Sequence, residues 1–288
     1  MKRPQWITIG IAILLVAGLY AATSKKLFGP PASGRPNVAA GSPASSFSID
    51  SMIAHAKTHL SADQNTRLGF LENSISREKS ADQKVHIYHQ LARFWQDSMR
   101  LIEPNEWFTP YAWYTAEAAR LENSEKSLTF AAHLLLNNLL IESKPEIKYW
   151  QASQAKDLFQ RSLNLNPGND SSRVGMGAVI IYGGVGGPME GIEMIRKVTD
   201  KDSNFVYAHW TLGQASLMSG QMPKAVERFK KVAQIQPGNL EAILLVADIS
   251  EQLGNKAEAI EWYGKLLPLI ENPAMKKEVE ARIAKLKK

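Results

Sequence analysis

The feature that most constrains this chain is a pattern that recurs at an interval of 34 residues. Gly220 aligns with Gly254, and Ala225 aligns with Ala259. The other aligned pairs are Val226 with Ile260, Phe229 with Tyr263, Val232 with Leu266, and Asn239 with Pro273. Two unrelated amphipathic helices match by chance at apolar positions, but here the turn glycine and the small residue behind it match as well. Self-similarity of this length indicates stacked supersecondary units.

Each aligned residue type has a physical role in a pair of antiparallel helices. Small residues such as Gly213 and Ala225 allow two helix backbones to approach closely where they cross. Phe229 and Tyr263 have the bulk to fill the space between one helix pair and the next. The aligned turn glycines are suited to the left-handed conformation that ends a helix. The pattern therefore predicts repeated helix hairpins.

The spacing of five residues connects these hairpins to a known repeat family. Leu212, Gly213, Ala225, Phe229 and Pro237 occupy the upstream Leu-Gly, the mid-repeat alanine, the late aromatic and the terminal proline of the tetratricopeptide pattern. The segment thus resembles a tetratricopeptide repeat. This resemblance implies an all-α fold in which antiparallel helix hairpins stack into a solenoid.

The repeat register divides the body of the chain. We expect repeats at 206–239 and 240–273, and a third at 170–205, where a longer glycine-rich turn replaces the single cap and Gly191 takes the alanine place. A fourth hairpin is expected at 124–169, with Phe159 at the aromatic position. Residues 48–123 form an N-terminal helical region, and 274–288 form a capping helix with a polar outer face.

Start signals support helices in the N-terminal helical region as well. Ser61 with Gln64 and Ser80 with Gln83 have capping-box spacing. Pro110 is expected in the first turn of a helix, where its missing N–H costs nothing.

The first 26 residues predict a membrane anchor. No charged residue stands between Arg3 and Lys25, and the 21 intervening residues match the thickness of a hydrocarbon core. The alternative is a cleaved signal peptide followed by secretion, but its apolar region is usually shorter. Residues 27–47, rich in Pro, Gly, Ala and Ser, are expected to be a disordered linker. The prediction is a single-pass inner-membrane protein of a bacterial envelope with a periplasmic domain.

Charge and composition exclude several function classes. The formal charge is +6, but residues 1–46 hold five basic and no acidic residues, which leaves 29 basic against 28 acidic in the rest. A folded domain so balanced lacks the basic surface that nucleic acid requires, so no nucleic-acid partner is expected. The chain has no cysteine, which excludes disulfides, thiolate catalysis and thiolate metal sites.

No motif predicts catalysis, a cofactor or a small-molecule substrate. The glycine-rich stretch at 183–188 lacks the Lys-Ser or Lys-Thr of a phosphate-binding loop and fits a hairpin turn. His55 and His59 have the spacing of zinc ligands, and His86 and His89 have a looser version. A metal-dependent enzyme built on these four histidines stays an alternative hypothesis, although the general-base glutamate of metalloproteases is missing.

Residues 94–114 contain an unusually dense group of aromatic side chains. These are Phe94, Trp95, Trp107, Phe108, Tyr111, Trp113 and Tyr114. They can serve as core between hairpins, or they can form an exposed patch for a partner. A structural homo-oligomer that pairs two copies through this region is a further alternative.

The resemblance implies where a partner would bind. In tetratricopeptide repeats the second, fifth, ninth and twelfth positions of the first helix line a concave groove that holds proteins or peptides. The corresponding residues are Tyr207, Trp210, Gln214, Leu217, Glu241, Leu244, Asp248 and Glu251. This set is aromatic and acidic, and Trp210 and Leu244 stand where a clamp for acidic chaperone tails needs lysine. Alternatively, Trp210 packs against the preceding repeat. The expected function is a non-enzymatic, membrane-tethered interaction scaffold or assembly factor.

Overall fold

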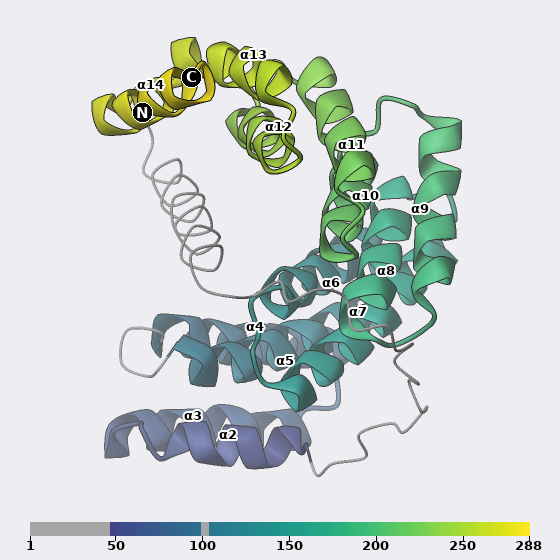
Figure 1. Cartoon of the computed structure of the whole chain (residues 1–288). Helices are drawn as coiled ribbons and strands as arrows, with labels where there is room; N and C mark the ends of the chain where they lie inside the picture. Colours follow the sequence, from purple (N-terminus) through teal and green to yellow (C-terminus); the bar gives the residue numbers. More distant parts are fainter. Residues whose placement is uncertain (1–46, 99–103) are drawn as a thin grey trace, which may run out of the picture. The chain divides into compact units, whose positions relative to one another are not determined.

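The computed structural model describes residues 47–98 and 104–288. Every regular element among them is helical, as expected for an all-α protein (Figure 1). The elements are α2 (Ile49–Lys57), α3 (Ala62–Arg77), α4 (Ala81–Asp97), α5 (Pro104–Glu122), α6 (Glu125–Leu139), α7 (Pro145–Leu165), α8 (Asp170–Gly183), α9 (Pro188–Lys201), α10 (Val206–Met218), α11 (Met222–Ile235), α12 (Leu240–Gln252), α13 (Lys256–Leu266), the short 3-10 helix η2 (Leu267–Leu269) and α14 (Pro273–Leu286).

The helices pack as hairpins in chain order. α6 packs on α7, α8 on α9, α10 on α11, and α12 on α13, and each hairpin contacts the next. The first helices α6, α8 and α10 also contact one another in succession. These three helices therefore lie side by side in the stack (Figure 1).

Turn glycines end two of the first helices, as the aligned pattern predicts. Gly220 has φ +72° and Gly254 has φ +78°, both in the left-handed region. Residues with a Cβ rarely adopt this conformation, so glycine is the residue that lets the chain reverse within a short turn.

The small residues of the repeat make room for large ones in the partner helix. A Cβ at Gly213 would lie 2.8 Å from Cε1 of Phe229, and a Cβ at Gly177 would lie 2.6 Å from Cγ1 of Ile195. In both hairpins a glycine of the first helix accommodates a bulky residue of the second. The space beside Gly213 is thus filled by the ring of Phe229, and the prediction that this glycine lets two helix backbones approach closely stays a prediction.

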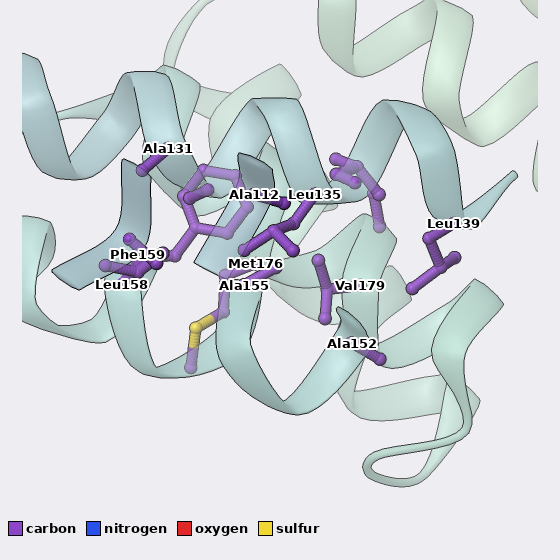
Figure 2. Packing of buried hydrophobic residues seen from close by; sticks show 14 of the residues in the cluster. Ala112, Ala131, Leu135, Leu139, Ala152, Ala155, Leu158, Phe159, Met176 and Val179 are labelled. Carbon is purple, nitrogen blue, oxygen red and sulfur yellow. The ribbon is translucent and has the colours of Figure 1, made fainter. Parts of the chain in front are cut away.

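The core follows the aromatic positions of the repeats. Phe159, Phe229 and Tyr263 are all fully buried. Figure 2 shows one core cluster, to which Leu135 of α6, Phe159 of α7 and Val179 of α8 contribute. A second cluster joins α11, α12, α13 and α14. Each core is shared by successive hairpins, so no hairpin buries its apolar face alone.

In the N-terminal part, two start signals are confirmed and one is wrong. Ser80 caps the start of α4, where its Oγ accepts the backbone N–H of Gln83. Ser61 and Gln64 form a complete capping box at the start of α3. Pro110, by contrast, lies inside α5, which begins at Pro104. Pro110 is buried, and α5 packs against α2, α4, α6 and α7. Tertiary packing evidently outweighs the hydrogen bond that an interior proline removes.

The dense aromatic group at 94–114 is mainly core. Phe94, Trp95, Phe108 and Tyr114 are buried, while Trp107, Tyr111 and Trp113 are partly buried against the same clusters. The packing interpretation of this group is therefore favoured over an exposed aromatic patch.

Residues 1–46 lie outside the described part of the chain, and with them the predicted membrane anchor and all but the last residue of the predicted linker. Among residues 47–98 and 104–288, none of the helices has the length and apolar character needed to cross a membrane.

Candidate functional site

The four groove residues predicted on α10 lie at the surface of the fold, and Tyr207 contacts α6 through His133. Tyr207, Trp210, Gln214 and Leu217 are all partly exposed. The Trp210 ring rests edge-on against Phe229, with centroids 5.2 Å apart and planes at 63°. Trp210 therefore packs against Phe229 of its own repeat, rather than against the preceding repeat as the alternative proposed, and it also keeps a partly exposed surface.

A recess lies where α10, α12 and the turn between α11 and α12 meet. Its volume is about 430 Å³. Its lining consists of Val206, Tyr207, Trp210, Gln236, Asn239 and Glu241. Three predicted groove residues, two aromatic and one acidic, thus come together in one hollow. We call these six residues the α10–α12 recess.

The aromatic face continues from the recess across the neighbouring repeats. The Tyr207 ring contacts the His133 ring of α6, with centroids 5.6 Å apart. His133 Nε2 in turn lies 3.3 Å from Ser171 Oγ of α8. Burial lowers the pKa of His133 and raises the pKa of Tyr207, so both side chains favour their neutral forms.

Glu241 is the one charged residue of the α10–α12 recess. It stands in the first turn of α12, where the helix dipole favours a carboxylate. Partial burial nevertheless raises the pKa of its carboxyl. Among the described residues Glu241 makes no ion pair, so its charge is available to a ligand.

Two amide side chains of the recess form hydrogen bonds within the fold. Asn239 Oδ1 accepts the backbone N–H of Ala242 at 3.0 Å and so caps α12. Asn239 Nδ2 donates to Gln236 Oε1, also at 3.0 Å. Each of these two amide oxygens therefore already accepts one hydrogen bond, whereas no hydrogen bond to the Glu241 carboxylate is present among the described residues.

The other residues predicted on α12 are occupied within the fold. Leu244 is 7% exposed and belongs to the core shared with α11 and α13. Asp248 Oδ1 accepts from Arg282 Nη1 of α14 at 2.7 Å, and Glu251 Oε2 accepts from the Tyr263 hydroxyl at 2.8 Å. Burial raises the pKa of Asp248 even though Tyr263 and Arg282 favour its ionised form. Through Arg282, the carboxylates of Asp248 and Glu251 help to hold α14 against the fold.

Sequence reasoning did not single out four other members of this face. Val206, Gln236, Asn239 and His133 lie outside the family's groove positions, and their contribution comes from contacts between hairpins. Ser171 could have been found, because it stands 36 residues before Tyr207 and so occupies the same position in the longer third repeat.

A second hollow of about 300 Å³ lies between α4, α5 and α6. Phe130, Tyr111 and Arg93 are among its lining residues, and Phe130 is 59% exposed. His89 also lines it and lies 2.5 Å from Glu122.

The histidines considered as metal ligands do not form a larger ligand group in the described residues. The rings of His55 and His59 lie 5.4 Å apart, edge to face. Across residues 47–98 and 104–288, no three His, Cys, Asp or Glu side chains gather in a way that could hold a metal ion.

Comparison with known proteins agrees with the repeat pattern. Residues 216–282 match the family model described as tetratricopeptide repeat. Residues 216–282 therefore contain tetratricopeptide repeats. A segment of 75 residues is 29% identical to the Protein CTR9 homolog of Arabidopsis thaliana; it covers 26% of this chain and only 7% of that protein.

Several solved structures are similar to this chain in fold. MamA from Desulfovibrio magneticus RS-1 is 20% identical with a TM-score of 0.42, over 64% of this chain and 94% of that one. YrrB, described as a TPR protein with an unusual peptide-binding site, is 15% identical with a TM-score of 0.41, over 73% and 97%. A tetratricopeptide repeat protein from Parabacteroides merdae is 13% identical with a TM-score of 0.49, over 82% and 85%. None of these likenesses bears on what this chain binds.

Proposed function

We propose that this protein is a non-enzymatic scaffold or assembly factor that binds a protein or peptide partner through the face formed by its first helices. The observation that carries this proposal is the α10–α12 recess, which places two partly exposed aromatic rings beside an unpaired carboxylate. Tyrosine and tryptophan are enriched among the residues that dominate binding energy at protein interfaces. Tetratricopeptide solenoids provide extended concave surfaces for such contacts.

The proposal includes tethering to the inner membrane of a bacterial envelope, with the repeat domain on the periplasmic side. Its support is the uncharged stretch between Arg3 and Lys25 and the Pro- and Gly-rich linker beyond it. Tethering would raise the local concentration of the binding face for partners in the same membrane. Protease accessibility of the tagged domain in spheroplasts measures its sidedness, and a domain that stays protected would contradict the periplasmic assignment.

The binding proposal is tested by purifying tagged full-length protein after mild crosslinking in its native cells. Two altered chains are compared with the native one: the double variant Tyr207→Ala with Trp210→Glu, and the single variant Glu241→Lys. The first removes the aromatic surface. The second reverses the charge of an exposed residue without removing core contacts, so it remains informative even if the first variant is destabilised.

The matched control is Phe70→Ala, which removes an aromatic ring that is 69% exposed on α3, away from the recess. We expect one or a few envelope proteins to co-purify with the native chain and the control and to be lost from both recess variants. Circular dichroism verifies that each variant is folded. Equal recovery of the same proteins with all four chains would refute binding at this face.

A further inference from the structure

We propose that the α10–α12 recess binds an arginine side chain of the partner, held between the exposed surfaces of Tyr207 and Trp210 and paired with the Glu241 carboxylate. This inference rests on the proposed function, because it names the chemistry that the partner must bring to that face. It adds a specificity that the presence of tetratricopeptide repeats does not imply.

The charge of the recess decides against the other ligand classes. Glu241 is its one charged residue, and its amide oxygens at Gln236 and Asn239 already accept hydrogen bonds. An anionic group would meet a like charge in the first turn of α12. A purely apolar side chain would cover the carboxylate and leave it desolvated without a partner, which is costly. A cationic side chain would form an ion pair with the Glu241 carboxylate and so replace the water that the carboxylate loses on binding.

The aromatic walls favour arginine over lysine. A planar guanidinium can lie on an indole face and donate to a carboxylate at the same time, whereas an ammonium is a compact point charge. Trp210 is held against the fully buried Phe229, and Tyr207 is held against His133. Because both rings are packed before a ligand arrives, little side-chain freedom is lost on binding.

The neighbouring repeat already holds an arginine in the same kind of surrounding. Arg282 of α14 lies over the Tyr263 ring, with its Cζ 5.5 Å from the ring centroid. Its Nη1 donates to Asp248 at 2.7 Å, and its Nε lies 3.9 Å from Glu251. Aromatic and acidic side chains of one repeat thus accept an arginine from the next element along the chain. The recess has the same combination with no internal arginine in the described residues to fill it.

The test uses full-length protein in detergent micelles and a phage-displayed library of random peptides. Selected peptides are synthesised with a fluorescent label, and each is paired with a version in which arginine is replaced by citrulline, which keeps the shape and removes the charge. Affinities are measured by fluorescence anisotropy for the native chain, for Glu241→Gln and for Trp210→Ala. Glu193→Gln, an exposed charge on α9 outside the recess, is the matched control.

We expect selected peptides to be enriched in arginine, and both citrulline replacement and Glu241→Gln to weaken binding about tenfold, as loss of a charge-assisted hydrogen bond does. Glu193→Gln should leave affinity unchanged. Peptides that lose affinity with Trp210→Ala but are indifferent to citrulline and to Glu241→Gln would overturn the arginine site and leave the proposed function intact. Selection of no peptide, or of peptides insensitive to every recess variant, would overturn both.

Discussion

Replacement of Gly191 by alanine separates what the repeat pattern predicts from what the structure predicts. The aligned positions in the next two repeats hold Ala225 and Ala259, both fully buried, so the pattern predicts that alanine is accepted. In the structure, a Cβ at residue 191 would lie 2.5 Å from the backbone oxygen of Gly177 and 2.8 Å from Cγ1 of Ile181. A backbone oxygen cannot rotate away as a side chain can. We therefore expect α8 and α9 to be forced apart.

The magnitude is set by two opposing effects. Overpacking of a filled core costs about 1–3 kcal/mol, and a contact with the backbone falls at the upper end of that range. Alanine recovers about 1 kcal/mol through its higher helix propensity. The expected net loss is about 2 kcal/mol of unfolding free energy. In a domain of this size, that loss lowers Tm by roughly 4–8 °C.

Thermal unfolding followed by circular dichroism measures the loss, and hydrogen exchange locates it in α8 and α9. The matched control is Gly264→Ala in α13, where an added Cβ would meet no atom within 4 Å. That change should raise stability by about 0.5–1 kcal/mol. If Gly191→Ala stabilises the protein as Gly264→Ala does, the steric argument for the α8–α9 contact is refuted.

The core and the C-terminal cap provide three further predictions. Burial raises the pKa of six tyrosines above 10.0, namely Tyr88, Tyr111, Tyr114, Tyr182, Tyr207 and Tyr263. Above pH 10 the unfolded chain loses phenolic protons that the folded chain keeps. The free energy of unfolding should therefore fall as the pH rises above 10, by up to about 1.4 kcal/mol per pH unit for each tyrosine. A Tm that does not change between about pH 9 and 11 would contradict this. Phe229→Ala leaves a cavity at a fully buried site and should lower the free energy of unfolding by about 3–5 kcal/mol, with faster hydrogen exchange in α10 to α12. A loss under about 1 kcal/mol would show that the hairpins move together and fill the cavity. Arg282→Met keeps the aliphatic stem but removes the hydrogen-bond donor to Asp248. Hydrogen exchange should therefore accelerate in α14 and stay unchanged in α6 and α7. If exchange in α14 is no faster than in the native chain, the ion pair does not hold the C-terminal cap.

Within each repeat, the sequence by itself determined the main packing contacts. Gly220, Gly254, Phe229 and Tyr263 could be assigned a turn or a core position from the 34-residue period alone. These roles depend on residues within one hairpin or its immediate neighbour, where local spacing dictates which side chains meet. The same reasoning failed at Pro110, because the contacts that keep it inside α5 come from other helices.

Only the tertiary structure decided which predicted groove residues are available to a ligand. Tyr207, Trp210 and Glu241 meet in a recess, whereas Leu244 is part of the core and Asp248 is bound by Arg282, 34 residues further along the chain. All of these residues occupy equivalent groove positions in two successive repeats. Their surroundings differ because Arg282 of α14 pairs with Asp248, while no arginine of the described residues pairs with Glu241. A periodic pattern specifies the unit, but contacts between units are set by the particular side chains that each neighbour presents.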